Sequence, residues 1–183
     1  MSGILEQYRE NRRILYGTDA LSAVFIIEKK KLGGKMEIRK LNPEQLEEIK
    51  DFFRDIFMNE PWNDDWSNDE QLTSYILDLS ANRNSLPLGL YVNGELTGLS
   101  LGSIVHWCTG TEYYIYEFCI RRDLQGRGYG KRFLSEIEKQ VKELGVNHIF
   151  LQTERTVPAY KFYTNNGFTE LKEHASLVKM LDE

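Results

Sequence analysis

Three glycines lie within seven residues in the stretch LQGRGYG, residues 124–130. Glycine loses more conformational freedom on folding than any other residue, so a cluster of this density needs a structural reason. One reason is a loop whose backbone N–H groups must approach a bound anion, and the other is a tight turn. The flanking segments predict a strand over EYYIYEFCI, residues 112–120, and an amphipathic helix over YGKRFLSEIEKQVKELG, residues 129–145. The glycines therefore connect a strand to a helix.

A glycine loop that leads from a strand into a helix is physically suited to binding an anion. The first N–H groups of a helix have no intrahelical acceptor, and the macrodipole adds partial positive charge at that end. Glycines let a phosphate oxygen approach these groups, and Arg127 and Lys131 add full positive charges. The spacing excludes a P-loop, because Arg132 stands where that motif requires Ser or Thr, and the dinucleotide pattern G-x-G-x-x-G is also missing. Phosphate binding and a plain turn remain the two interpretations.

Composition and charge narrow the class of protein. The chain has 183 residues, of which 41% are hydrophobic, and this suits one compact domain. A net charge of −5 argues against a general nucleic-acid binder, and no apolar run approaches the roughly 20 residues of a membrane span. Cys108 and Cys119 are too few for a disulfide framework, and the three histidines are scattered. We therefore expect a soluble cytoplasmic protein without a structural metal, a membrane partner or a nucleic-acid partner.

The first 35 residues differ in character from the rest of the chain. The alternating Met36, Ile38 and Leu41 predict the first strand of a domain that covers residues 36–183. The Leu-Gly-Gly-Lys sequence just before Met36 can be encoded by a purine-rich stretch that resembles a bacterial ribosome-binding site. Our hypothesis is that residues 1–35 are an N-terminal extension and that Met36 is the natural start.

Helices are predicted on both sides of a β meander. Capping boxes begin helices at Asn42 and Ser67, and Asn93-Gly94 between two β-rich runs predicts a hairpin. The helix that follows Ser67 has an apolar stripe made of Leu72, Tyr75, Ile76 and Leu79. Later in the chain the pattern predicts a strand over residues 147–153, a short helix over 157–166 and a last strand over 176–181.

The glycine stretch also resembles a family motif. RDLQGRGYGK, residues 122–131, is similar to the acyl-CoA motif of GNAT N-acyltransferases, usually written Q/R-x-x-G-x-G/A, with Gln125, Gly128 and Gly130 at its fixed positions. A second family segment, A-x-x-F-Y-x-x-x-G-F, is matched by Ala159, Phe162, Tyr163, Gly167 and Phe168. The resemblance covers residues 36–183. It implies an α+β GNAT fold, in which a mixed, mostly antiparallel twisted sheet carries helices on both faces.

The resemblance implies acetyl-CoA as the acyl donor and assigns the residues that bind it. In this family the loop N–H groups bind the pyrophosphate, and the strand before the loop splays from its neighbour and pairs with the pantetheine arm. Here the strand positions are Phe118, Cys119 and Ile120, and the loop positions are Gln125, Gly126, Arg127, Gly128, Tyr129, Gly130 and Lys131. The second segment adds Thr156, Ala159 and Phe162. Thr156 stands where many members carry Asn, and its hydroxyl is able to bond the pantetheine or to cap the helix.

Two residues are candidates for the proton transfers of amine acylation. The resemblance implies that Tyr163 lies near the thioester sulfur, and a phenol with a pKa near 10 is suited to protonate a departing thiolate. The alternative is that Tyr163 packs in the core, since Phe162 and Tyr163 share an apolar helix face. Glu117 is the candidate base, because an apolar flank raises the pKa of a carboxyl toward neutrality. The alternative is that Glu117 lies on a solvated strand face.

The segment NEPWNDDWSNDE, residues 59–70, is the candidate substrate-binding segment. It places Asp64 and Asp65 between Trp62 and Trp66, a combination that suits a cationic amine through charge attraction and cation–π contact. The resemblance implies that this region covers the acceptor pocket. The alternative is a solvated acidic loop whose tryptophans anchor the two neighbouring helices.

The predicted activity is the transfer of an acetyl group from acetyl-CoA to a primary amine of a small cationic molecule, by direct attack in a ternary complex. Two alternatives remain open. One is a protein or peptide N-acetyltransferase, and the other is a non-catalytic acyl-CoA-binding module. Family members of this kind are often dimers, so the resemblance also implies a homodimer.

Overall fold

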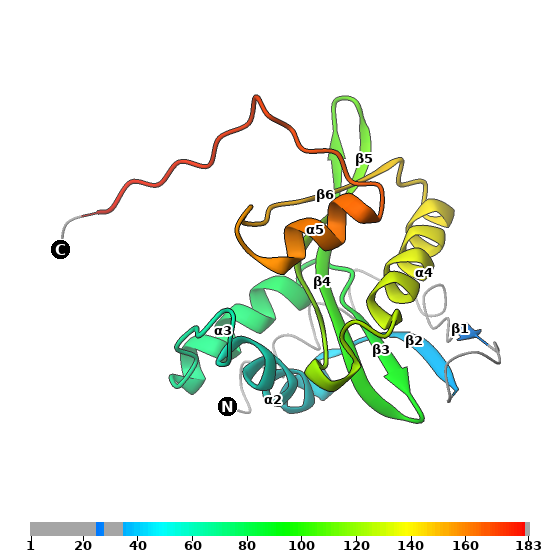
Figure 1. Cartoon of the computed structure of the whole chain (residues 1–183), viewed down its shortest axis with the longest axis vertical. Coiled ribbons are helices and arrows are strands. Elements are labelled where there is room, and N and C mark those ends of the chain that lie inside the picture. The colour runs from blue at the N-terminus through cyan, green and yellow to red at the C-terminus, as the bar shows by residue number, and fades with distance from the viewer. Residues whose placement is uncertain (1–24, 28–34, 182–183) are drawn as a thin grey trace. The chain divides into compact units, whose positions relative to one another are not determined.

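The computed structural model describes residues 25–27 and 35–181. Its strands form a single sheet in the order β1-β2-β3-β4-β5-β6, in which each pair of neighbours is antiparallel except β5 and β6, which are parallel (Figure 1). The strands are β1 (Phe25–Ile27), β2 (Met36–Lys40), β3 (Leu88–Val92), β4 (Glu95–Trp107), β5 (Gly110–Ile120) and β6 (His148–Leu151). The sheet is therefore mixed and mostly antiparallel, as predicted.

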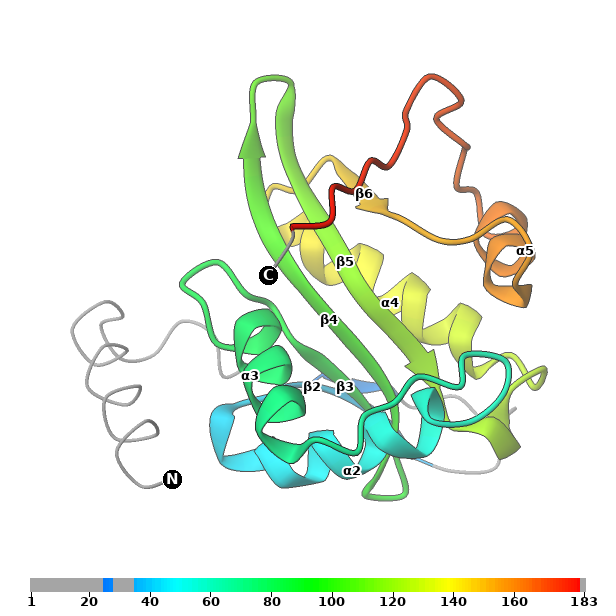
Figure 2. The same ribbon diagram turned by 90° about the vertical axis from the view of Figure 1, so that its left-hand side faces the viewer.

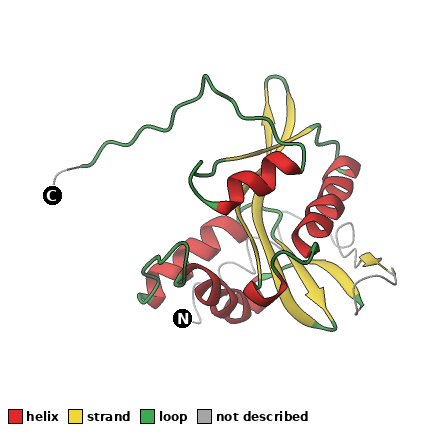
Figure 3. Ribbon diagram, viewed as in Figure 1, coloured by secondary structure: helices red, strands yellow, loops and turns green. Residues whose placement is uncertain are grey.

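The described chain has four α-helices and two short 3-10 turns. The helices are α2 (Leu46–Phe57), α3 (Asp69–Ser80), α4 (Tyr129–Glu143) and α5 (Pro158–Asn165), and the turns are η1 (Pro43–Gln45) and η2 (Arg122–Leu124). Helices α2 and α3 cover one face of the sheet and α4 covers the other, as Figures 2 and 3 show. The chain divides into two compact units, residues 1–152 and 153–183, and α5 belongs to the second. No helix in the part of the chain that the structure describes has the length and apolar content needed to cross a membrane.

Strand β1 belongs to the first 35 residues, which we treated as an extension of the domain. It pairs with β2 in the register Phe25 to Ile38. The remainder of the extension, residues 1–24 and 28–34, lies outside the described residues. The hypothesis that Met36 is the natural start stays a prediction.

The predicted start of the first helix and the predicted hairpin are both confirmed. The side chain of Asn42 accepts a hydrogen bond from the N–H of Glu44, and Gln45 Oε1 accepts one from the N–H of Asn42. One 3-10 turn intervenes before α2 begins. At the hairpin between β3 and β4, Asn93 and Gly94 have φ values of 53° and 88°, which is the left-handed backbone that this short turn requires.

Two details of the predicted elements are wrong. The cap of α3 is Asn68, whose Oδ1 accepts the N–H of Gln71 at 3.1 Å, whereas the N–H of Ser67 donates to Asp65 in the preceding loop. Both residues stand three before a polar side chain, so the spacing alone does not separate them. The predicted last strand over residues 176–181 is absent from the described chain, because an alternating pattern forms a strand only where a partner strand accepts its hydrogen bonds.

Helices α2 and α3 bury one hydrophobic cluster against the sheet. From the helices it takes Leu46, Ile49, Phe52, Phe53, Ile56, Phe57, Leu72, Ile76 and Leu79. From the strands it includes Leu99 and Leu101 of β4 and Cys119 of β5. Phe118 points to the opposite face, where its ring lies 5.4 Å from that of Phe133 on α4. Since side chains alternate along a strand, Glu117 lies on the same face as Cys119, toward α2 and α3.

A β-bulge in β5 lies immediately before Glu117. Leu101 of β4 pairs with Glu117, but the next residue, Gly102, pairs with Ile115, which leaves Tyr116 as the extra residue. A bulge bends its strand and re-aims the side chains around it. Glu117 therefore stands at an irregular point of the sheet, opposite the helices that cover it.

Candidate active site

Glu117 is half-buried and points at α3. The hydroxyl of Tyr75 donates a hydrogen bond to Glu117 Oε1 at 2.5 Å. Burial raises the pKa of the Glu117 carboxyl to about 7, although the hydrogen bond from Tyr75 lowers it, and the negative charge of Asp64 raises it further. Glu117 is therefore not the solvated strand residue of the alternative interpretation, and it exchanges protons near neutral pH.

Tyr75 is a site residue that the sequence analysis placed in an apolar stripe. Its ring is stacked on Trp66 at a centroid distance of 4.9 Å and meets Phe53 edge-on at 5.9 Å. Burial, the charge of Glu117 and the charge of Asp64 raise its pKa far above the usual range, so the phenol stays protonated and donates. A tyrosine on an apolar helix face needs a hydrogen-bond partner for its hydroxyl, and this need is the sequence signal that could have identified Tyr75 as a site residue. The pattern alone does not say which residue is that partner.

The two adjacent aspartates of the acidic segment have different roles. Asp64 is close enough to Glu117 and Tyr75 for its charge to raise both of their pKa values, and its backbone N–H donates to the carbonyl of Phe57 at 2.9 Å. Asp65 instead accepts hydrogen bonds from Ser67, which lower the pKa of its carboxyl. The structure therefore brings Asp64, but not Asp65, into electrostatic reach of Glu117.

Trp62 and Trp66 both pack against the hydrophobic cluster. The ring of Trp62 lies 5.9 Å from that of Phe57, and the ring of Trp66 lies 5.5 Å from that of Phe53. Both indoles are partly buried against the cluster. This packing is what the anchoring alternative predicts. Trp66 also stacks on Tyr75, the residue that bonds Glu117. It therefore anchors the segment and at the same time lies close to Glu117.

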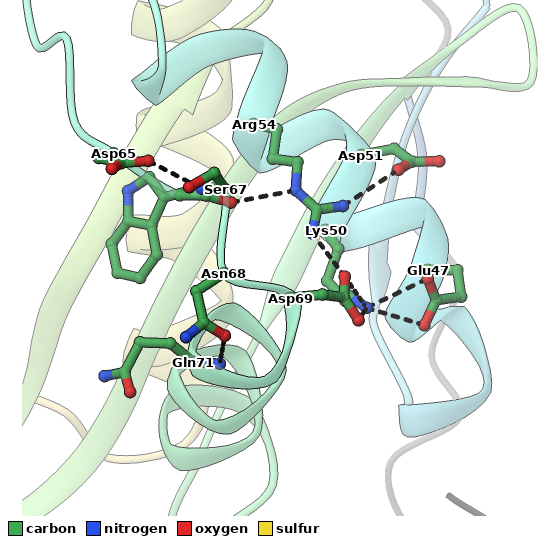
Figure 4. Close-up of polar contacts among 10 residues, drawn as sticks. Glu47, Lys50, Asp51, Arg54, Asp65, Ser67, Asn68, Asp69 and Gln71 are labelled. Carbon is green, nitrogen blue, oxygen red and sulfur yellow. Dashed lines mark hydrogen bonds and ion pairs between the residues drawn. The ribbon is translucent and has the colours of Figure 1, made fainter.

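An ion-pair network holds the acidic segment between α2 and α3 (Figure 4). The ammonium of Lys50, whose side chain is only 2% exposed, lies 2.8 Å from Asp69 and 3.1 Å from Glu47. Burial works to lower the pKa of Lys50, but the hydrogen bonds with Asp69 and Glu47 outweigh it and the pKa is raised. Arg54 bonds Asp69 at 2.5 Å and reaches the carbonyl of Trp66 at 3.4 Å. The network thus neutralises Asp69 and fixes the backbone that carries Trp66.

The glycine loop has the backbone conformation that only glycine adopts without strain. Gly126 and Gly128 have φ values of 70° and 86°. A Cβ added at either position would meet no atom within 4 Å, so the requirement is conformational rather than steric. Gln125 ties the loop to the end of β5, since its side-chain nitrogen donates to the carbonyl of Ile120 at 2.9 Å.

The loop residues lead directly into the first turn of α4, which begins at Tyr129. The helical ladder begins where the N–H of Arg132 donates to the carbonyl of Gly128 at 3.1 Å. Within the described part of the chain, no hydrogen bond uses the N–H groups of residues 126–131. Arg127 and Lys131 are exposed beside them. The residues therefore fit an anionic group, because they supply backbone donors, a helix N-terminus and two cationic side chains.

The last part of β5 extends beyond its ladder with β6. The parallel ladder covers Glu112 to Ile115 of β5 and pairs with His148 to Leu151 of β6. In the described chain, this ladder does not extend to residues 116–120 of β5, and the carbonyl of Ile120 accepts a hydrogen bond from the side chain of Gln125. The thiol of Cys119 is buried in the cluster, and burial raises its pKa well above the usual value. It is not an activated nucleophile.

The second unit carries the A-x-x-F-Y-x-x-x-G-F segment. The ring of Tyr163 lies 5.3 Å from that of Phe162 and 5.3 Å from that of Phe168. Gly167 has a φ of 92° and reverses the chain after α5, so that the N–H of Phe168 donates to the carbonyl of Tyr163 at 3.1 Å. This local packing explains the spacing of the motif.

Thr156 lies in the turn before α5 and does not cap that helix. The cap position is Val157, and no side chain caps it. Ala159 lies in the first turn of α5, which begins at Pro158. Contacts of Thr156, Ala159, Phe162 and Tyr163 with an acyl donor stay predictions.

Among the described residues, no group of three or more His, Cys, Asp or Glu side chains is arranged to hold a metal ion.

The sequence of residues 46–168 matches the model of the acetyltransferase (GNAT) family, and the chain belongs to that family. The resemblance drawn from the two motifs is thereby confirmed. No curated protein matches the sequence at a significant level.

Solved structures with the same fold are distant in sequence. One is a possible acetyltransferase from Clostridium difficile 630, with a TM-score of 0.69, 14% identity and coverage of 80% of this chain and 99% of that one. A second is an aminoglycoside acetyltransferase from an uncultured soil metagenomic sample, in complex with sisomicin, with a TM-score of 0.63, 18% identity and coverage of 80% and 97%. A third is the aminoglycoside N-acetyltransferase AAC(6')-Iy in complex with CoA, with a TM-score of 0.64, 16% identity and coverage of 84% and 100%. At these identities the likeness shows the fold.

Proposed function

We propose that this chain is an N-acetyltransferase that transfers the acetyl group of acetyl-CoA to a primary amine of a small cationic molecule, by direct attack in a ternary complex. One observation carries the proposal. Glu117, a half-buried carboxyl with a pKa of about 7, lies on the strand that leads into the glycine loop, next to the negative charge of Asp64. A cationic acceptor and an acyl donor would therefore meet at the end of β5.

The acyl donor is the substrate for which the loop is suited. The N–H groups of residues 126–131, with Arg127 and Lys131, would hold its pyrophosphate. The part of β5 beyond the ladder with β6, at Phe118, Cys119 and Ile120, would lie along its pantetheine arm. Support comes from a solved structure of the same fold that contains CoA and from another that contains a CoA bisubstrate analogue. The donor supplies an activated acetyl group as a thioester.

The acceptor side favours a cation. Asp64 and Glu117 present two carboxylates, while Asp69 is neutralised by Lys50 and Arg54. Tyr75, which bonds Glu117, and Trp66, which stacks on Tyr75, are aromatic residues beside this carboxylate. Solved relatives of the fold are aminoglycoside acetyltransferases, and one contains sisomicin. This is in accord with a small polycationic acceptor for the present chain.

The proton inventory of the reaction requires one base and one acid. With its pKa near 7, Glu117 is partly deprotonated at neutral pH and is able to take the proton of the acceptor ammonium, directly or through a water molecule. Tyr163 would donate its phenolic proton to the departing thiolate, in keeping with its place in the family motif. Trp62 and Asp65 belong to the same segment, in which Trp62 packs on Phe57 and Asp65 is bonded to Ser67. A cytoplasmic location and a homodimer stay predictions.

Thiol release from acetyl-CoA, measured over a panel of amines, tests the proposal. We expect turnover with small polycationic amines and a rise in melting temperature with acetyl-CoA, since a ligand that binds only the native state must stabilise it. Turnover with peptide N-termini or lysines alone would replace the proposed acceptor by a protein. Stabilisation by acetyl-CoA without turnover on any amine would indicate a non-catalytic acyl-CoA-binding module.

A further inference from the structure

Tyr75 packs against two aromatic rings that also contact each other. Trp66 is stacked on its ring at an interplanar angle of 25°, and Phe53 meets it at 65°. Trp66 is in turn fixed through its carbonyl by Arg54. The hydroxyl therefore has little freedom to turn away from Glu117 Oε1, to which it donates at 2.5 Å.

We propose that Tyr75 is a positioning residue that fixes the Glu117 carboxylate with Oε1 engaged and Oε2 left to receive the acceptor amine. This inference rests on the proposed function and assigns a role that the family motifs do not contain. A carboxylate with one oxygen bonded to a rigid donor has already lost rotational freedom before the substrate arrives. Binding of the substrate therefore costs less conformational entropy of the Glu117 side chain.

The surroundings of Glu117 make Tyr75 the group that keeps it charged. Burial and the charge of Asp64, from the loop between α2 and α3, both favour the protonated carboxylic acid. Leu101 faces Glu117 from β4 and is apolar, and Cys119 on the same strand is a neutral thiol. Among these groups only the hydrogen bond from Tyr75 favours the carboxylate.

The chain offers a matched control for removal of this hydroxyl. Tyr91 on β3 also donates to a glutamate, Glu48 Oε2 at 3.1 Å, and accepts a hydrogen bond from Gln45 at 2.6 Å. Its variant Tyr91→Phe removes a tyrosine–glutamate hydrogen bond from the same face of the sheet without touching Glu117. Both Tyr75→Phe and Tyr91→Phe keep their aromatic rings, so the packing is preserved.

The first test is the pH profile of kcat/KM for the wild-type protein and the two variants, with an amine that the wild type acetylates. For Tyr75→Phe we expect the acidic limb to move up by about one pH unit, because a hydrogen bond to a charged group is lost. The rate near pH 7 would then fall about fivefold and recover toward pH 9. Tyr91→Phe should follow the wild type. A Tyr75→Phe profile with unchanged pH dependence, lowered or not, would overturn the proposal.

The second test does not depend on turnover. The titration of Glu117 is followed by NMR in protein labelled with ¹³C at glutamate carboxyl groups, and Glu117→Gln identifies the signal. We expect Glu117 to titrate at higher pH in Tyr75→Phe, and at lower pH when a fluorinated tyrosine with a more acidic phenol replaces Tyr75. Equal titration in all forms would refute the role of Tyr75. A chain that acetylates no amine would instead refute the proposed function, whatever the titration shows.

Discussion

The glycine loop, residues 125–131, and the acidic segment, residues 59–70, were both predicted from the sequence as binding segments. They differ in how much of their structure the sequence determines. The loop depends on backbone conformation, and Gly126 and Gly128 adopt the left-handed φ values that their identity predicts. The acidic segment depends on side-chain partners. Asp64 and Asp65 are neighbours of the same type, yet only Asp64 lies within electrostatic reach of Glu117. Local motifs are thus easier to interpret than clusters of charge.

The largest effect is expected from Glu117→Gln, on the acceptor side of this comparison. Loss of a general base lowers turnover by about 10²- to 10⁴-fold. Binding of acetyl-CoA, measured by calorimetry, should be unchanged, because the loop is intact. Glu48→Gln is the control, since Glu48 also accepts from a tyrosine but lies outside the site. A turnover loss in Glu117→Gln matched by an equal loss of acetyl-CoA affinity would contradict the assignment.

The same variant should be more stable than the wild type at high pH. The pKa of Glu117 is raised on folding from 4.5 to about 7, so the protonated form is favoured in the folded state. The associated stability is present below pH 4.5 and is lost as the pH rises through 7. Glu117→Gln, which is always neutral, should match the wild type at pH 4 and melt several degrees higher at pH 8. Equal melting temperatures at pH 8 would show that the carboxyl is not held in a desolvated site.

A loop variant, Gly128→Ala, tests the other side of the comparison. Alanine at a φ of 86° is strained, and relief of the strain displaces the N–H groups that we propose to bind the donor. We expect the KM for acetyl-CoA to rise about tenfold, a loss of the order of one charge-assisted hydrogen bond, with the pH profile unchanged. Gly145→Ala is the matched control, because Gly145 has a φ of 80° at the other end of α4. An equal rise in KM in both variants would indicate general destabilisation.

Substitution of the two adjacent aspartates is a more specific test, with a smaller expected effect. Asp64→Asn removes a negative charge that raises the pKa of Glu117, so the acidic limb of kcat/KM should move to lower pH. The KM for a cationic amine should rise a few-fold, of the order expected for a partly screened charge pair. Asp65→Asn should change neither quantity, since Asp65 is bonded to Ser67. Equal effects of the two substitutions would mean that the segment acts only through its total charge.

The smallest effect is expected from Asp69→Asn in the network that holds the acidic segment. Lys50 and Arg54 lower the pKa of Asp69, so its contribution to stability is present above pH 3.8 and is lost as the pH falls below that value. The variant should melt slightly below the wild type at pH 7 and at the same temperature near pH 2. Melting curves at the two pH values decide. A larger difference in melting temperature at pH 2 than at pH 7 would contradict the lowered pKa of Asp69.

Much of the fold could be predicted because its signals are local. The capping box at Asn42 and the turn at Asn93-Gly94 involve residues within three positions of each other. The predicted cap at Ser67 was wrong by one residue, because Asn68 satisfies the same spacing. The predicted strand over residues 176–181 was wrong because a strand requires a partner that no local pattern supplies.

By itself the sequence determined two motifs, whose resemblance to a family implied the mixed sheet, and it determined the backbone of the glycine loop, since motif spacing and glycine positions are properties of neighbouring residues. Only the tertiary structure decided that Glu117 meets Tyr75 across 42 positions of the chain and that Asp64 rather than Asp65 acts on it. The physical reason is that desolvation and hydrogen bonding depend on which distant side chains share one space, and that information does not exist until the helices pack against the sheet.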